Sequence, residues 1–262
     1  MKERLVSPIK SGFEYVAGKI LWEATRTVRF EVDDPNGNFV EAAEALDNNY
    51  SILAYSNHIS RFDPALVVRF ADRYLTPVRN ISGIAGLKHY DSARTESSTN
   101  VRNATRLVQK YTGLGVILVV QDYDKASYPE PSVATNNKSA AEFNASAFLR
   151  AARILRTPGK VLFVAPEGTR SKTGELAKAE EGLDTLFRLS GERTLAMPIA
   201  IVPPEKDGIK PLLSKVKLRP GEPMSLEDLN LLKTLNPGVS GTDLMMRHLA
   251  SLLSQHLRGF YR

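Results

Sequence analysis

Residues 50–64 read YSILAYSNHISRFDP, an apolar run that passes directly into a polar segment. Its first half, residues 50–56, is apolar enough for a strand buried on both faces of a sheet. Its end favours a helix, because Asp63 is a good N-cap residue and Pro64 suits the first helical position. Residues 161–171, VLFVAPEGTRS, repeat the pattern of an apolar strand followed by a polar loop. Two strands of this kind indicate parallel pairing in an α/β protein.

The segments on either side extend this alternation. Further strands are predicted at residues 27–32, 116–121, 194–202 and 215–218, and helices at residues 64–75, 101–111, 139–155, 176–189 and 244–257. The order predicts an α/β fold with a mixed, largely parallel sheet flanked by helices. We expect a single domain over residues 27–262, in which the polar run 122–138 is an exposed insertion loop.

An amphipathic helical segment is predicted over residues 1–26. Its apolar residues recur at steps of three and four, which is the helical period; they are Leu5, Ile9, Phe13, Val16 and Ile20. The helix could pack on the domain or lie on a membrane surface, and interspersed lysines suit either arrangement.

Composition removes several classes of function. The chain has 262 residues, a formal net charge of +6, four His and no Cys. Without Cys there is no disulfide scaffold, thiolate zinc site or thiol nucleophile. No uncharged stretch approaches the roughly 20 apolar residues of a membrane-spanning helix. The motifs G-x-S-x-G, H-E-x-x-H and G-x-x-x-x-G-K-[ST] are also absent.

The positive charge is concentrated in three segments, residues 1–30, 69–110 and 205–219. Local basic surfaces indicate an anionic partner, which could be a lipid surface, a phosphorylated substrate or nucleic acid. Aromatic residues are not interleaved with the basic ones, as a single-stranded nucleic-acid platform requires.

The first candidate site is N-H-x-x-x-x-D, formed by Asn57, His58 and Asp63. In a regular helix, residues five apart lie about 140° apart, so His58 and Asp63 can meet only if the chain turns after the strand. The carboxylate would then fix the imidazole tautomer and leave the other ring nitrogen as a general base. Alternatively, Asp63 only caps the helix and His58 is a loop residue.

The second candidate site is the loop P-E-G-T-R-S at residues 166–171. Ligands of α/β sheets bind outside the carboxyl ends of the strands, where this loop lies. Gly168 lets the backbone approach a ligand, and Thr169 and Arg170 supply donors that suit a phosphate. Alternatively, the loop is a plain turn in which Glu167 pairs with Arg170.

Taken together, the two motifs resemble those of the glycerolipid acyltransferase family, whose type members acylate 1-acylglycerol-3-phosphate. Residues 57–63 match that family's N-H-x-x-x-x-D motif, and residues 166–171 match its P-E-G-T-R-S motif. Residues 197–203, MPIAIVP, look like its fourth motif. The second motif departs from the family pattern, because Gln121 follows the strand at 116–120 where the family has a phosphate-binding Arg.

The resemblance implies a membrane-associated enzyme of phospholipid biosynthesis. His58 would be the general base and Asp63 its orienting partner, with direct transfer from acyl-CoA or acyl-acyl carrier protein and no cofactor or metal. Glu167, Gly168, Thr169 and Arg170 would hold the acceptor. Backbone N–H groups near Pro64 are candidate oxyanion donors.

The expected partners are a lysophospholipid acceptor, an acyl thioester donor and the cytoplasmic face of a membrane, without nucleic acid. Arg102, Arg106 and Lys110 form a helical stripe that could dock anionic lipid or an acyl carrier protein, or could be a solvated face. The acceptor could instead be glycerol-3-phosphate, another lysophospholipid or a glycolipid. Two other classes stay open, which are a non-catalytic lipid-binding protein and a nucleic-acid binder.

Overall fold

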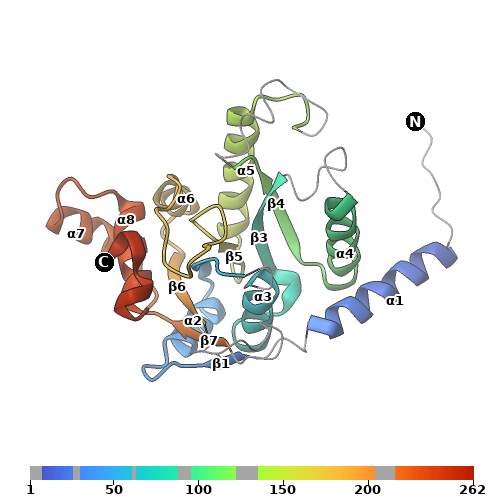
Figure 1. The fold of residues 1–262 in the computed structure, drawn as a ribbon, viewed down its shortest axis with the longest axis horizontal. Helices are drawn as coiled ribbons and strands as arrows, with labels where there is room; N and C mark the ends of the chain where they lie inside the picture. The colour runs from blue at the N-terminus through green and yellow to red at the C-terminus, as the bar shows by residue number, and fades with distance from the viewer. Residues whose placement is uncertain (1–7, 26–29, 61–62, 88–95, 122–134, 204–215) are drawn as a thin grey trace.

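A seven-stranded sheet organises the protein, whose computed structural model describes residues 8–25, 30–60, 63–87, 96–121, 135–203 and 216–262 (Figure 1). In sheet order the strands are β1 (Phe30–Val32), β7 (Val216–Pro220), β6 (Thr194–Val202), β2 (Ser51–Tyr55), β5 (Val161–Val164), β3 (Ile81–Gly86) and β4 (Gly115–Val119). Every neighbouring pair is parallel except β6 and β7. The predicted α/β class with a mixed, largely parallel sheet is therefore confirmed.

Helices connect the strands and cover the sheet. In the described part of the chain they are α1 (Pro8–Ala24), α2 (Asn38–Asp47), α3 (Asp63–Tyr74), α4 (Glu96–Thr112), α5 (Ala140–Leu155), α6 (Leu183–Ser190), α7 (Leu226–Leu235) and α8 (Gly241–Ser251). Short 3₁₀ turns follow at Val78–Asn80, Gln255–Leu257 and Gly259–Tyr261.

Strand β2 lies in the middle of the sheet and joins two hydrophobic cores. Successive side chains of a strand point to opposite faces. Ile52 and Ala54 pack in one core with residues of α2 and α3. Leu53 and Tyr55 pack in the other with residues of α5, α6 and α8. All four side chains are buried, so the helices form a layer on each face of the sheet.

Helix α1 lies beside α4 (Figure 1). The two helices approach closely at Gly18, where an added Cβ would lie 2.2 Å from the backbone oxygen of Leu107. The rings of Tyr15 and Tyr111 meet edge to face with centroids 5.0 Å apart. Trp22, one turn beyond Gly18, is buried in the core that holds α2 and α3. The alternative in which the N-terminal helix packs on the domain is therefore the observed one.

The side of α1 that faces solvent is not the side that the apolar pattern predicts. Val16 and Ile20, which belong to the apolar stripe that the sequence defines, are 53% and 64% exposed. The contact face instead contains Gly18, because only a residue without a Cβ allows this approach of the two backbones. Lys110 of α4 forms an ion pair with Glu14 of α1, so part of the expected basic stripe is used within the protein.

The helix predicted at residues 176–189 is wrong in its first half. α6 begins only at Leu183, behind Gly182 with a φ of 117°. The preceding segment uses its backbone N–H groups elsewhere: Ala177 donates to Glu167, Ala179 to Tyr261 and Glu180 to Pro166. These tertiary bonds replace the ladder of a helix, and periodicity alone does not reveal them.

Other boundaries also differ. α4 begins at Glu96, so residues 97–100 lie inside the helix that they were expected to precede. β4 is an edge strand and only half-buried, although its apolar sequence is typical of a central strand. The C-terminal helix α8 ends at Ser251, before the predicted residue 257. Elements α2, β3 and α7 were not predicted. Most of the predicted insertion loop, residues 122–134, lies outside the described residues.

No helix among the described residues is long and apolar enough to cross a membrane.

Candidate active site

Both motif loops lie at the same edge of the sheet. β2 and β5 are parallel neighbours in register, with Ile52 opposite Val161 and Tyr55 opposite Val164. The pairing continues one step further, because the N–H of Ser56 donates to the oxygen of Val164 at 3.1 Å. The segments after the two strands therefore leave the sheet side by side, as expected for ligand-binding loops of a parallel sheet.

His58 and Asp63 are in direct contact. The imidazole Nδ1 lies 2.9 Å from Oδ2 of Asp63, and the two side chains are 21% and 5% exposed. A carboxylate can only accept, so Nδ1 carries a proton, and in the neutral imidazole this tautomer leaves the lone pair on Nε2. The turn that brings the two residues together was required by their spacing, and the predicted contact is confirmed.

Asp63 also shapes the turn that carries His58. Its Oδ2 accepts the backbone N–H groups of Ile59 and Ser60, each at 2.6 Å. This oxygen thus faces back along the chain, toward the segment that precedes α3. The N–H groups of Ile59 and Ser60 are engaged in these bonds, and the oxyanion donors expected near Pro64 stay a prediction.

Asn57 anchors the loop to β6 on its other side. Its Nδ2 donates to the oxygen of Ile201 at 2.8 Å, and its Oδ1 accepts the N–H of Ile201 at 2.7 Å. The side chain is 2% exposed. We did not assign Asn57 a role from the sequence, although a buried amide at the end of a strand must find backbone partners.

The loop of residues 166–171, named here the acceptor loop after its predicted role, contacts His58 through its two ends. Oε1 of Glu167 accepts the N–H of His58 at 2.8 Å, and the N–H of Ser171 donates to the oxygen of His58 at 2.7 Å. Oε2 of Glu167 accepts the N–H of Ala177 at 2.8 Å. Burial raises the pKa of Glu167 above its ordinary value, although both N–H groups act to lower it. The carboxylate of Glu167 therefore bonds to these N–H groups instead of pairing with Arg170, which was the alternative interpretation of the loop as a plain turn.

The middle of the acceptor loop is open to solvent. Thr169 and Arg170 are exposed, whereas Glu167 is 4% exposed. Gly168 has a φ of 67°, and an added Cβ would collide with the carboxylate of Glu180. The side chain of Gln121 donates to the oxygen of Gly168. Gln121 therefore holds the loop by its backbone.

The structure thus joins three of the predicted site residues by hydrogen bonds and leaves three apart. His58 bonds to both Asp63 and Glu167, whereas Gly168 bonds to Gln121 and Ala165. Within the described ranges, no hydrogen bond or ion pair joins Thr169 or Arg170 to the His58–Asp63 pair. Their proposed contacts with an acceptor stay predictions.

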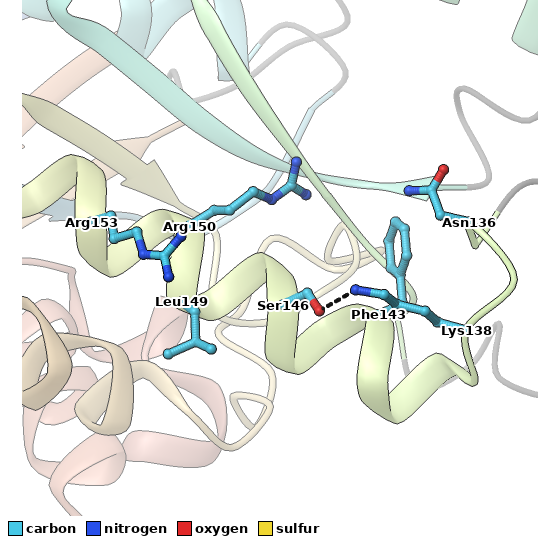
Figure 2. Close-up of a pocket in the computed structure, with 7 residues that line it drawn as sticks. All are labelled: Asn136, Lys138, Phe143, Ser146, Leu149, Arg150 and Arg153. Atoms are coloured by element: carbon cyan, nitrogen blue, oxygen red, sulfur yellow. Dashed lines mark hydrogen bonds between the residues drawn. The ribbon is translucent and has the colours of Figure 1, made fainter.

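Two surface hollows lie elsewhere. One of about 340 Å³ runs along α5 and is lined by Asn136, Lys138, Phe143, Ser146, Leu149, Arg150 and Arg153 (Figure 2). The other, of about 360 Å³, is lined by Gln255, His256 and Arg262. Neither contains a predicted site residue. The part of the chain that the structure describes also has no group of three His, Asp or Glu side chains placed to hold a metal ion.

Comparison with known proteins gives a likeness of fold. No protein-family model matches the sequence, and no curated protein matches it. The fold is similar to the crystal structure of the 1-acyl-sn-glycerophosphate (LPA) acyltransferase PlsC from Thermotoga maritima, with a TM-score of 0.47 and 14% sequence identity. The likeness covers 92% of this chain and 81% of that one.

Proposed function

We propose that the protein is an O-acyltransferase that moves a fatty acyl group from a thioester to the free hydroxyl of a glycerolipid acceptor. The observation that carries the proposal is the His58–Asp63 pair, with Nδ1 and Oδ2 2.9 Å apart at the carboxyl edge of the sheet. A base held in this tautomer suits hydroxyl activation. The motif resemblance supplies the reaction class.

The reaction proceeds by direct transfer. Nε2 of His58 takes the proton of the acceptor hydroxyl while that oxygen attacks the thioester carbonyl. The tetrahedral intermediate then collapses, the carbon–sulfur bond breaks, and the imidazolium returns the proton to the departing thiolate. Asp63 stabilises the imidazolium between these steps. The products are an ester and a free thiol, and no acyl-enzyme forms.

The acceptor proposed is 1-acylglycerol-3-phosphate, which would yield phosphatidic acid. Thr169 and Arg170 are its phosphate ligands, because both are exposed on the loop that touches His58, and a guanidinium binds phosphate bidentately. The donor is acyl-CoA or acyl-acyl carrier protein. Glycerol-3-phosphate, another lysophospholipid and a glycolipid are the alternative acceptors for the same chemistry.

The lipid is reached from a membrane surface. On the side of α1 away from α4, the exposed apolar side chains are Val16 and Ile20, which are 53% and 64% exposed. The opposite side of α1 is fixed on α4, so the helix can offer this face to the cytoplasmic leaflet without leaving the domain. An amphipathic helix of this kind gives peripheral binding.

An acceptor panel tests the proposal. The purified protein is given one acyl thioester and, separately, each of the four acceptor types, and the products are identified by lipid mass spectrometry. We expect acylation of the phosphorylated lysolipid. Acylation only of an acceptor without phosphate contradicts the role of Arg170, and vesicle binding with no acylation of any acceptor favours a non-catalytic lipid-binding protein.

A further inference from the structure

Both backbone polar groups of His58 are held by the acceptor loop. The N–H donates to Oε1 of Glu167 at 2.8 Å, and the carbonyl oxygen accepts the N–H of Ser171 at 2.7 Å. Glu167 lies 109 residues from His58 in sequence, so this is a tertiary contact between the two loops. We call these two contacts the His58 clamp.

The carboxylate of Glu167 is enclosed and has little freedom to face a ligand. It is 4% exposed, and its second oxygen accepts the N–H of Ala177 at 2.8 Å. A charge buried to this degree is tolerated where hydrogen bonds satisfy it. One side chain thus joins three segments, which carry His58, the acceptor loop and Ala177.

The residues between the two ends of the clamp face outward. Thr169 and Arg170 are exposed, and the backbone just before them is fixed by Gln121, which donates to the oxygen of Gly168. A ligand on Thr169 and Arg170 is therefore within three residues of both contacts with His58.

We propose that Glu167 is a positioning residue for His58, and that the His58 clamp couples occupancy of Thr169 and Arg170 to the placement of the imidazole. Asp63 fixes the ring and its tautomer, whereas the clamp fixes the backbone from which the ring projects. These are two separate requirements. Both matter for the reaction, because a misplacement of the imidazole by about 1 Å can cost about 100-fold in rate. The catalytic consequence rests on the proposed acyltransferase function, but the clamp itself does not.

Two variants separate the shape of Glu167 from its charge. Glu167→Gln keeps the length but replaces one accepting oxygen with an NH₂ group, which cannot accept an N–H. Glu167→Asp keeps the charge but is one methylene shorter, so it cannot span both N–H groups. Glu175→Gln is the matched control, because Glu175 lies in the following segment and its carboxylate forms an exposed ion pair with Arg262 at 3.4 Å.

Amide hydrogen exchange tests the clamp without any substrate. Exchange at His58, Ala177 and Leu53 is followed by NMR in the full chain, with Leu53 reporting that the fold is intact. In each Glu167 variant we expect exchange at His58 or Ala177 to rise about 10-fold or more while Leu53 stays protected, and no change in Glu175→Gln. Unchanged exchange at both sites in a folded variant overturns the clamp.

Kinetics test the positioning role. In both Glu167 variants we expect kcat to fall about 10- to 100-fold, with the acceptor KM changed less than about threefold. A KM raised tenfold at unchanged kcat makes Glu167 an acceptor ligand and overturns the proposal, as does full activity in Glu167→Asp. If the unmodified protein acylates no acceptor, the proposed function fails, whereas the exchange experiment still decides the clamp.

Discussion

The side-chain amide of Asn57 bonds both backbone polar groups of Ile201, at 2.8 and 2.7 Å, and so ties the start of the His58 loop to the neighbouring strand β6. Replacing the amide leaves a buried N–H and a buried carbonyl without partners. Each such group costs about 1–3 kcal/mol. We expect Asn57→Ala to lower the free energy of unfolding by about 2–4 kcal/mol in urea titrations and to reduce acyl transfer in the folded protein.

Asn80→Ala is the matched control for Asn57. Asn80 also uses its amide twice, donating to Thr76 and accepting from Lys160, but it precedes β3 at the opposite edge of the sheet. We expect this variant to lose stability and keep its activity. Equal loss of activity in the two variants would mean that the effect of Asn57 is only general destabilisation.

Asp63→Asn tests the charge beside His58. The amide oxygen can still accept N–H groups, so the turn is retained, but the negative charge that stabilises the imidazolium is lost. We expect kcat to fall roughly 10²- to 10⁴-fold with little change in melting temperature. Near-normal kcat in the folded variant refutes the assigned role of Asp63.

Arg170→Ala tests phosphate binding. Arg170 is exposed, so its removal leaves the fold intact, and the loss of a bidentate partner raises the KM of a phosphorylated acceptor about tenfold or more. Lys172→Ala removes the same charge from an exposed position two residues further on and serves as the control. An equal rise of the acceptor KM in the two variants would mean that Arg170 contributes only general electrostatic attraction.

The exposed apolar face of α1 is tested with lipid vesicles. We expect Val16→Ser with Ile20→Ser to weaken binding to anionic vesicles about tenfold or more, because both side chains bury apolar area in the interface. Leu231→Ser with Leu235→Ser is the control, since these α7 side chains are 58% and 67% exposed on another helix. Vesicle affinity that falls equally in the control contradicts a specific role of α1.

The raised pKa of Glu167 predicts that the free energy of unfolding depends on pH. Burial raises the pKa of Glu167 in the folded protein above its ordinary value of 4.5. Folding therefore favours the protonated carboxyl group. Its contribution to the free energy of unfolding is fully present below pH 4.5 and is lost as the pH rises through the folded pKa. Glu167→Gln has no such loss. Urea titrations should therefore show the variant gaining stability relative to the natural protein as the pH rises above 4.5. A difference that is constant or of opposite sign contradicts the raised pKa.

The local chemistry of the sequence predicted the sheet and the His58–Asp63 contact. The apolar runs at 50–56 and 161–165 form the strands β2 and β5, as their composition predicted, whereas their adjacency in the sheet passes over β3 and β4 and does not follow from the alternation of strands and helices. The spacing of His58 and Asp63 required a turn, and that turn is present. These features depend on residues close in sequence.

The features that were missed depend on contacts between distant residues. The segment before Leu183 has a helical period, but Glu167, Pro166 and Tyr261 take its N–H groups. Val16 and Ile20 were expected to form the packing stripe of α1, but Gly18 sets the contact face. Glu167 was expected at the acceptor, and only the structure shows that its oxygens accept the N–H groups of His58 and Ala177. Such partners have no signature in local periodicity.

The role of His58 as general base is tested by comparing acyl transfer in the natural protein and in His58→Ala. Both proteins receive one acyl thioester and 1-acylglycerol-3-phosphate on lipid vesicles, and the product is measured by mass spectrometry. The imidazole is 21% exposed, so its removal should leave folding and vesicle binding unchanged. We predict that the natural protein forms phosphatidic acid and that the variant loses about 10²- to 10⁴-fold of the rate. Equal rates in the two proteins would contradict the assignment of His58 as the general base.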